Sequence, residues 1–219
     1  MTDTIQPLLD QLLARADPGF VPPVFEAALA ESVLGASGGP RTPHRRLLER
    51  MNGGYFFERA LHVFGACEEP PWHSLRAWNA PALWRDAYGE TAGGLVCFAE
   101  DAFGDQYAYS GRGGEVVCFE AELGRVVSVA PHFVAWLEGL LEQPESVLPL
   151  DVIRREVETR GPLAPGWQLF AYPPLCTVES RQGVKVGQVD AVEAMRFRGA
   201  LALQLRNLPP GARVAIEIE

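Results

Sequence analysis

Four short apolar runs separated by glycine-bearing turns constrain the fold of this chain more than any other feature. They lie between residues 95 and 130, in the order LVCFA, QYAYS, EVVCFE and RVVSVA. The first turn carries Gly104, the second is GRGG and the third is AELG. Glycine supplies backbone conformations that tight turns need. Short runs bounded by such turns predict four strands that pair with their neighbours as an antiparallel meander.

The segment after the last run predicts a helix that packs on one face of this sheet. Its large apolar residues follow the i, i+3, i+4, i+7, i+8 spacing of an amphipathic helix: Phe133, Trp136, Leu137, Leu140 and Leu141. The residue pattern predicts further helices over 8–13, 24–34, 44–51, 81–88 and 150–160. YFFERALHVFG (55–65) favours a strand, with a helix left open, and the alternation in ARVAIEIE (212–219) predicts a half-buried strand.

Charge and cysteine usage narrow the classes of function. A net charge of -9 and a pI near 5.0 argue against a general binder of nucleic acid or of anionic membranes, and suit a basic protein partner. The four cysteines never form C-x-x-C, so neither a zinc site nor a redox pair is indicated. The N-terminus lacks the apolar core of a signal peptide, and no apolar run is long enough to span a membrane. We therefore expect a cytoplasmic protein.

The stretch FAEDAFGDQYAY (98–109) carries three carboxylates among aromatic residues: Glu100, Asp101 and Asp105. Their spacing does not match the D-x-D-x-D-G calcium loop with its distal glutamate, which argues against a metal site. An acid–base pair would need a pocket and shifted pKa values, which residue order does not reveal. Two interpretations remain for the stretch. It is a hairpin whose turn is shaped by Gly104 and Asp105, or it also presents a surface to a partner.

No arrangement typical of an enzyme is found elsewhere in the sequence. The histidines (His44, His62, His73 and His132) lack metal-ligand spacing, and GASGG is not the G-x-S-x-G turn of a serine nucleophile. GRGGE lacks the G-K-[ST] ending of a phosphate-binding loop. We therefore expect no catalytic residues, no metal and no cofactor.

Four segments, in this order, resemble the SUKH superfamily: NGG…LHVFG, W…LWRDAYG, GGLVCFAEDAFGDQYAYS and GEVVCFEAELGRVVSVAPHFVAWLEGLL. They cover residues 51–141 of the chain. That superfamily comprises yeast cell-wall regulatory proteins and many bacterial immunity proteins that neutralise toxins. Many members end soon after the last of these segments, whereas this chain continues. Its tail more distantly resembles the C-terminal part of type VI secretion immunity proteins whose first half is related to a glutamate-sensing module.

The resemblance implies an α+β fold, with a mainly antiparallel sheet, flanking helices and a C-terminal α/β extension. We divide the chain into a SUKH-like domain with a helical N-terminus (1–144) and an extension of a helix and short strands (145–219). The extension either packs on the same core or forms a small second unit.

The resemblance also implies a non-enzymatic immunity protein that binds and neutralises a cognate secreted toxin of the nuclease or deaminase type. The expected partner is a basic toxin, and neither nucleic acid nor a membrane. The expected contact residues are Glu100, Asp101, Phe103, Asp105 and Tyr107, with Trp78 and Trp84 at the edge. Two alternatives stay open: a regulatory module that binds a small molecule in a cleft beside the hairpin, and an enzyme that uses the carboxylates.

Overall fold

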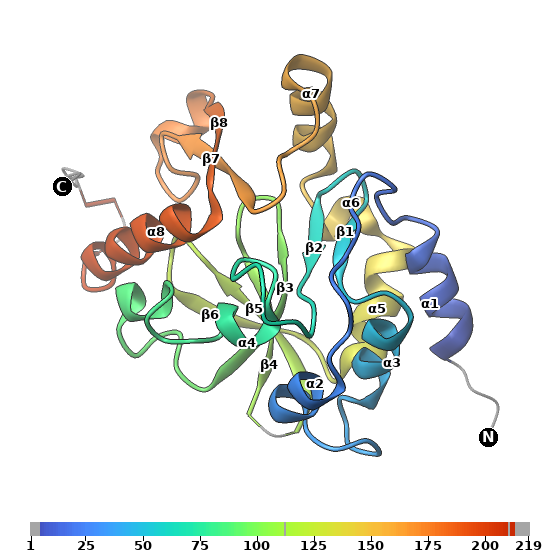
Figure 1. Cartoon of the computed structure of the whole chain (residues 1–219). Helices are drawn as coiled ribbons and strands as arrows, with labels where there is room; N and C mark the ends of the chain where they lie inside the picture. Colours follow the sequence, from blue (N-terminus) through green and yellow to red (C-terminus); the bar gives the residue numbers. More distant parts are fainter. Residues whose placement is uncertain (1–4, 112, 210, 213–219) are drawn as a thin grey trace.

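Two antiparallel sheets organise the chain in a computed structural model that describes residues 5–111, 113–209 and 211–212 (Figure 1). Six strands form a meander in the order β1-β2-β3-β4-β5-β6, and β7 pairs only with β8 among the described residues. The strands are β1 (Gly54–Phe56), β2 (Leu61–Val63), β3 (Leu95–Asp101), β4 (Gln106–Ser110), β5 (Glu115–Glu120), β6 (Arg125–Ala130), β7 (Trp167–Tyr172) and β8 (Lys185–Asp190).

Helices lie before, between and after these strands. They are α1 (Ile5–Leu13), α2 (Ala27–Leu34), α3 (Thr42–Arg50), α4 (Leu75–Trp78), α5 (Phe133–Glu142), α6 (Pro144–Val147), α7 (Leu150–Arg160) and α8 (Ala191–Leu205), with the 3-10 helices η1 (Arg85–Tyr88) and η2 (Glu179–Gln182). The predicted α+β fold with an antiparallel sheet and flanking helices is therefore confirmed, as is the four-strand meander over 95–130.

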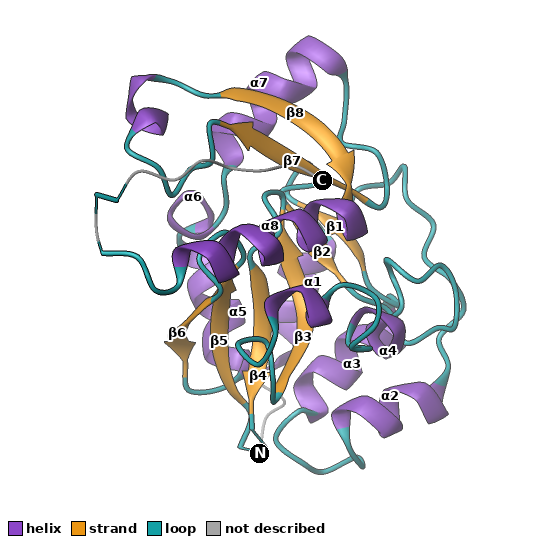
Figure 2. Ribbon diagram, turned by 90° about the vertical axis from the view of Figure 1, so that its left-hand side faces the viewer, coloured by secondary structure: helices purple, strands orange, loops and turns teal. Residues whose placement is uncertain are grey.

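Both faces of the six-stranded sheet are covered at its central strands, which explains why β3 begins with an apolar run without alternation. On one face, Trp84 and Phe119 pack against Tyr88 of η1, and α8 lies against η1. On the other, Phe98 packs against Phe133 and Trp136 of α5. Figure 2 shows α8 on the near side of the sheet and α5 behind its strands. The apolar stripe of the predicted helix over 133–141 is the face that α5 buries against the sheet.

Three turns of the sheet lie together at one end of its strands, because alternate turns of a meander lie at the same end. The turn between β1 and β2 meets the turn between β3 and β4, where the Ala102 N–H donates to the Ala60 carbonyl. The C-terminal segment crosses this end of the sheet, and the Leu169 N–H of β7 donates to the Ala102 carbonyl at 2.7 Å. Buried residues of the segment, such as Leu169 and Met195, belong to the same hydrophobic core as the sheet.

The strands predicted over 55–65 and 212–219 differ in their outcome. Residues 55–65 form two short strands, β1 and β2, around a turn, so the single predicted strand is corrected. The turn residues Phe57, Glu58 and Arg59 all have positive φ angles, a conformation that the apolar pattern does not reveal. The strand predicted over 212–219 lies, except for its first residue, outside the described residues.

Candidate functional site

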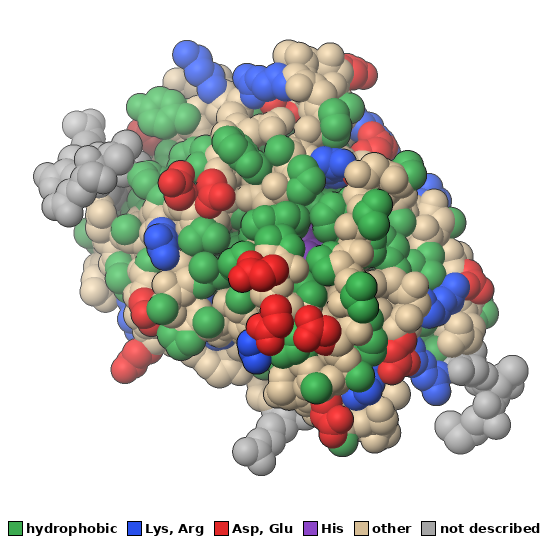
Figure 3. Space-filling view, viewed as in Figure 1, with side chains coloured by type: hydrophobic (Ala, Val, Ile, Leu, Met, Phe, Trp, Pro, Cys, Tyr) green, Lys and Arg blue, Asp and Glu red, His purple; other side chains and the backbone are tan. Residues whose placement is uncertain are grey.

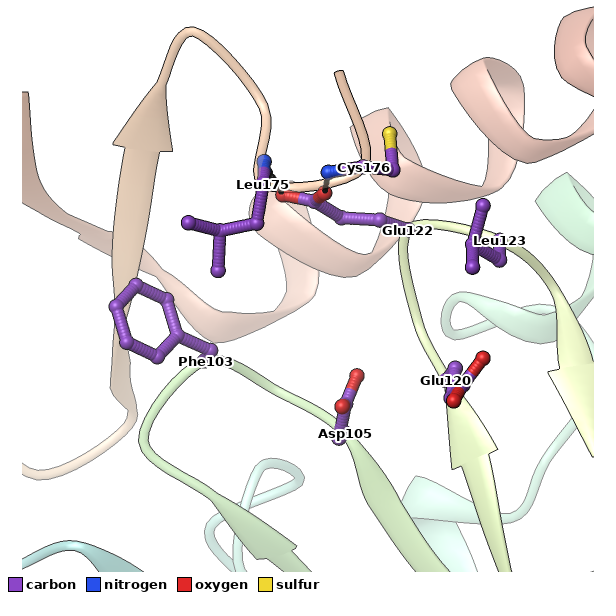
Figure 4. Close-up of a pocket in the computed structure, with 7 residues that line it drawn as sticks. All are labelled: Phe103, Asp105, Glu120, Glu122, Leu123, Leu175 and Cys176. Atoms are coloured by element: carbon purple, nitrogen blue, oxygen red, sulfur yellow. Dashed lines mark hydrogen bonds between the residues drawn. The ribbon is translucent and has the colours of Figure 1, made fainter. Parts of the chain in front are cut away.

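A surface pocket of about 210 Å³ lies where the β3–β4 turn, the β5–β6 turn and the C-terminal segment meet (Figure 4). Its walls are Phe103, Asp105, Glu120, Glu122, Leu123, Leu175 and Cys176. The close-up shows Phe103 and Leu175 on one side, with Asp105 and Glu120 at the ends of their strands, below the segment that carries Cys176. The pocket thus combines three carboxyl groups with apolar walls.

The carboxyl groups of the pocket differ in their partners. Glu122 accepts hydrogen bonds from the backbone N–H groups of Leu175 and Cys176, at 3.1 and 2.7 Å. Glu120 forms an ion pair with Arg125 at the surface, where the Glu120 side chain is 28% exposed. Asp105 accepts from the Ala121 N–H at 2.8 Å. Among these contacts, Asp105 and Glu122 accept from backbone N–H groups, whereas Glu120 is bound only to the Arg125 side chain. Glu120 is therefore best placed to exchange Arg125 for another cation.

Burial raises the pKa of Asp105 to about 6, although the hydrogen bond from Ala121 and the nearby Arg198 charge oppose the rise. Burial also raises the pKa of Asp101, with the Asp105 charge adding to the effect. The Asp105 carboxyl is therefore ionised at neutral pH and loses its negative charge as the pH falls through about 6. The Asp105 carboxylate lies in the pocket with the carboxyl groups of Glu120 and Glu122, a set that suits a cationic group.

The β3–β4 turn is shaped by Asp101 and Gly104. The Asp101 carboxylate accepts hydrogen bonds from the N–H groups of Phe103 and Asp105, at 2.9 and 3.0 Å. Gly104 has a φ of +85°, and a Cβ atom there would lie 2.5 Å from the Gln168 Oε1 atom, so only glycine fits. Gly104 therefore shapes the turn as predicted, whereas Asp101, and not Asp105, supplies the side-chain hydrogen bonds inside it.

Arg198 of α8 is a buried cation beneath this turn, with 2% of its surface exposed. Its guanidinium group donates to the Gln168 side chain and, at 2.7 Å, to the Leu169 carbonyl. Its charge opposes the rise in pKa of both Asp101 and Asp105. The C-terminal segment thus holds the turn in place and balances part of its negative charge.

Glu100 belongs to a buried hydrogen-bond network and is 3% exposed. Its Oε2 atom accepts from the side-chain amides of Gln106 at 2.9 Å and Gln168 at 2.7 Å, and its Oε1 atom lies 3.1 Å from the His62 Nδ1 atom. The His62 Nε2 atom lies 2.9 Å from the His73 Nδ1 atom. This network joins the sheet to the C-terminal segment, so Glu100 has a structural role here.

Four of the seven predicted contact residues are buried in the core, which corrects their assignment to the surface. Trp78 is 0% exposed and Trp84 1%, because the two rings pack on each other, Trp78 also on Phe64, and Trp84 also on Phe119. Tyr107 is 4% exposed and its hydroxyl donates to the Val147 carbonyl, and Glu100 is buried as described above. Phe103 and Asp105 do line the pocket, while Asp101 is half-buried in the turn.

The sequence pattern missed five of the pocket residues, although two of them, Glu120 and Glu122, could have been predicted. The β3–β4 and β5–β6 turns lie at the same end of a meander, and Gln106 pairs with Phe119, so Asp105 and Glu120 must be neighbours. Combining the predicted meander with the turn FEAELG would have placed Glu120 and Glu122 beside the hairpin turn. No local pattern brings Leu175 and Cys176 there, because their contacts span more than 50 residues of sequence.

A second group of carboxylates lies on an open surface. Figure 3 shows acidic side chains gathered near the middle of the face around α4, among apolar side chains. Glu26, Glu68 and Glu69 surround Cys67, whose pKa is raised to about 11 by burial and by these charges. Glu68 forms an ion pair with Arg76, and Glu26 accepts from the Glu68 N–H at 3.1 Å. The side chains of Glu68 and Arg76 are more than half exposed, so the pocket is the more enclosed of the two acidic sites.

The chemistry of the pocket favours recognition of a cation. Among the described residues, no group of three His, Cys, Asp or Glu side chains is arranged to hold a metal ion. A volume of about 210 Å³ is below the roughly 300–1,000 Å³ typical of small-molecule sites. Phe103 and Leu123 can contact an aliphatic stem while the carboxylates pair with its charged end. A lysine or arginine side chain has this combination of properties.

Comparisons with known proteins bear on the fold. Residues 43–139, less than half of the chain, match the SMI1 / KNR4 family (SUKH-1). The crystal structure of Atu4351 from Agrobacterium tumefaciens superposes with a TM-score of 0.56 at 14% sequence identity, covering 86% of each chain. At this identity the likeness shows a shared fold. A search of curated proteins found no match. No helix among the described residues is both long and apolar enough to cross a membrane.

Proposed function

We propose, from the premise that the chain belongs to the SUKH superfamily through residues 43–139, that it is an immunity protein that binds and neutralises a basic toxin. It acts by stoichiometric binding without catalysis in the cytoplasm, and its partner is a toxin of the nuclease or deaminase type, delivered by a secretion system such as type VI. The observation that carries this proposal is the acidic pocket at the end of the six-stranded sheet where its turns meet the C-terminal segment.

Charge supports the choice of a basic partner. The chain has a net charge of -9, and the pocket adds three carboxyl groups beside apolar walls. Complementary charge speeds the encounter of two proteins and aligns them, while a side chain inserted into a pocket supplies the anchor of the interface. In this arrangement a toxin lysine or arginine enters between Phe103 and Leu123 and pairs with Glu120, which exchanges Arg125 for the toxin.

The alternative of a small-molecule sensor has one supporting feature, which is that the pocket lies beside the hairpin as that hypothesis requires. Its volume and its three carboxyl groups fit a single cationic side chain better than a metabolite. A thermal-shift screen separates the two functions, because a ligand that binds only the folded state raises the melting temperature. Stabilisation by the toxin, and by none of the metabolites screened, is the result expected.

Charge reversal at Glu120 is expected to weaken toxin binding at least tenfold, which corresponds to about 1.4 kcal/mol or more. The probe is the catalytically inactivated toxin domain encoded beside this gene, and the measurement is isothermal titration calorimetry. Glu120→Lys suits this test better than changes at Asp101 or Asp105, because those carboxylates support turns. The surface ion pair that it removes contributes only about 0–1 kcal/mol to stability.

Glu31→Lys is the matched control, since it makes the same charge change on an exposed position of α2. We expect it to alter the dissociation constant less than threefold. Equal losses in both variants would assign the effect to net charge and remove the pocket from the interface. Failure of the unmodified chain to bind the toxin domain would refute the proposed function itself.

A further inference from the structure

β6 is an edge strand whose side chains remain uncovered. Five of its six residues, from Arg125 to Val129, are exposed, so neither face of the strand is closed by the rest of the chain. Val126, Val127 and Val129 keep 43%, 40% and 44% of their surface exposed. No described strand pairs with the outer side of β6, which lies at the left edge of the sheet in Figure 2. No backbone group of the described residues is paired with the outer N–H and C=O groups of β6.

The opposite edge of the same sheet is treated differently. β1 has three residues, all buried, and the N-terminal segment runs along its outer side. There the Asp17 N–H donates to the Tyr55 carbonyl at 2.8 Å, and Ala16 forms a β-bridge with Phe56. Among the described residues, the chain thus closes one edge with its own backbone and leaves the other unpaired.

β6 has one of the features that usually protect a bare edge, a shift in its register with β5 between Val116 and Val117, and lacks the others. Proteins guard such strands with proline, with lysine or other charges, or by keeping them very short. β6 has six residues and no proline, and its single charge, Arg125, is bonded to Glu120. A valine-rich strand of this length is a template for another strand.

The bare edge is continuous with the acidic pocket. Glu120, Glu122 and Leu123 line the pocket, and two residues later the same turn becomes β6. A segment paired with β6 therefore has one end at the pocket, where a basic residue can reach the carboxylates. The Leu123 side chain, 40% exposed, connects the pocket to the valines of the strand.

We propose that the toxin adds an extended basic segment as a seventh strand alongside β6, with a lysine or arginine of that segment seated in the acidic pocket. This inference rests on the proposed function and specifies how its partner is held. Backbone hydrogen bonds supply the affinity of strand addition, and side-chain pockets supply its specificity. A second copy of this chain is a poorer occupant, because two edges from chains of net charge -9 repel each other.

Proline substitution at two consecutive positions tests strand addition with a built-in control. The N–H groups of Val126 and Val127 point to opposite sides of β6, one toward β5 and one toward the free edge. Proline removes an N–H group, so one variant breaks the pairing with β5 while the other blocks only an added strand. We expect the variant that keeps its melting temperature to bind the inactivated toxin domain at least tenfold more weakly.

A third variant keeps the test decisive if both prolines impair folding. Val129→Lys places a charge at an exposed position of the edge, and we expect the same loss of binding without a change in melting temperature. Unchanged toxin affinity in a folded edge variant would overturn strand addition while leaving toxin binding intact. If light scattering shows a dimer that these variants convert to a monomer, a second copy occupies β6 and the inference is wrong. Absence of binding by the unmodified chain would instead reject the proposed function, and this inference with it.

Discussion

Replacing Glu100 by leucine is expected to lower the free energy of unfolding by about 3–5 kcal/mol, whereas glutamine at this position costs only about 1 kcal/mol. The leucine removes the partner of three hydrogen bonds and leaves the polar groups of His62, Gln106 and Gln168 that face it buried. Leaving buried polar groups without partners costs far more than exchanging one hydrogen-bonding group for another.

Glutamine at position 100 can keep the hydrogen bonds of the network because of where the protons lie on His62 and His73. The His73 Nε2–H donates to the Asn52 carbonyl at 3.0 Å, and burial lowers the His73 pKa to about 3, so its Nδ1 atom is an acceptor. His62 therefore donates its Nε2–H to His73. One proton then lies between the His62 Nδ1 atom and Glu100, and the amide group of a glutamine can donate there while its oxygen accepts from Gln106 and Gln168.

Urea unfolding of the two Glu100 variants at pH 7.5 measures the difference. The expected order of stability is the unmodified chain first, Glu100→Gln slightly below it, and Glu100→Leu well below both. Equal destabilisation by glutamine and leucine would mean that the charge of Glu100, and not its hydrogen bonds, stabilises the junction with the C-terminal segment.

Replacing His44 by phenylalanine is expected to stabilise the chain by about 1–3 kcal/mol at pH 7.5, since a buried polar group without a partner is removed. The ring of His44 is fully buried beside Phe98 and Tyr109 and stacks on Phe133 with centroids 5.1 Å apart. Neither of its ring nitrogens has a hydrogen-bond partner among the described residues. A phenylalanine ring suits these aromatic surroundings better.

The gain at position 44 should grow as the pH falls. Burial, aided by the nearby Arg41 charge, lowers the His44 pKa from 6.5 to about 3 in the folded chain. Below pH 6.5 the unfolded chain binds a proton that the folded chain does not, so stability is lost between pH 6.5 and about 3. That loss is about 1.4 kcal/mol per pH unit, or about 2 kcal/mol at pH 5.

Unfolding of both proteins at pH 7.5 and pH 5 isolates this contribution. His73 has the same downward shift in both proteins, and Asp101 and Asp105 have the same upward shifts, so these effects cancel in the difference. An advantage for His44→Phe that stays constant with pH would show that His44 takes up its proton equally in both states.

Local patterns predicted the parts of the fold that depend on nearby residues. The meander over 95–130 and helix α5 follow from short apolar runs, glycine turns and the spacing of Phe133 to Leu141, all of which act within one or two elements. Trp78 and Trp84 illustrate the limit. The sequence around a tryptophan gives no sign of its direction, and only the contacts with Phe64 and with Phe119 of β5 show that both rings point into the core.

The part of the site that escaped prediction depends on the docking of the C-terminal segment. The contacts of Gln168 with Glu100 and of Leu175 with Glu122 join residues far apart in sequence. α8 gives a weak sequence signal, because its buried face has helical spacing but includes Arg198, Gly199 and several alanines in place of large apolar residues. The hairpin turn contributes Phe103 and Asp105 to the acidic pocket, but the pocket forms only when that segment crosses the end of the sheet.

Hydrogen–deuterium exchange on the complex with the inactivated toxin domain tests most directly whether the partner binds at this edge of the sheet. The predicted result is slower exchange of backbone amides at residues 103–106 and 120–130, covering both pocket turns and β6, relative to the free chain. A stable complex in which these amides exchange as in the free chain, with protection confined to surfaces such as α2 and α3, would contradict it.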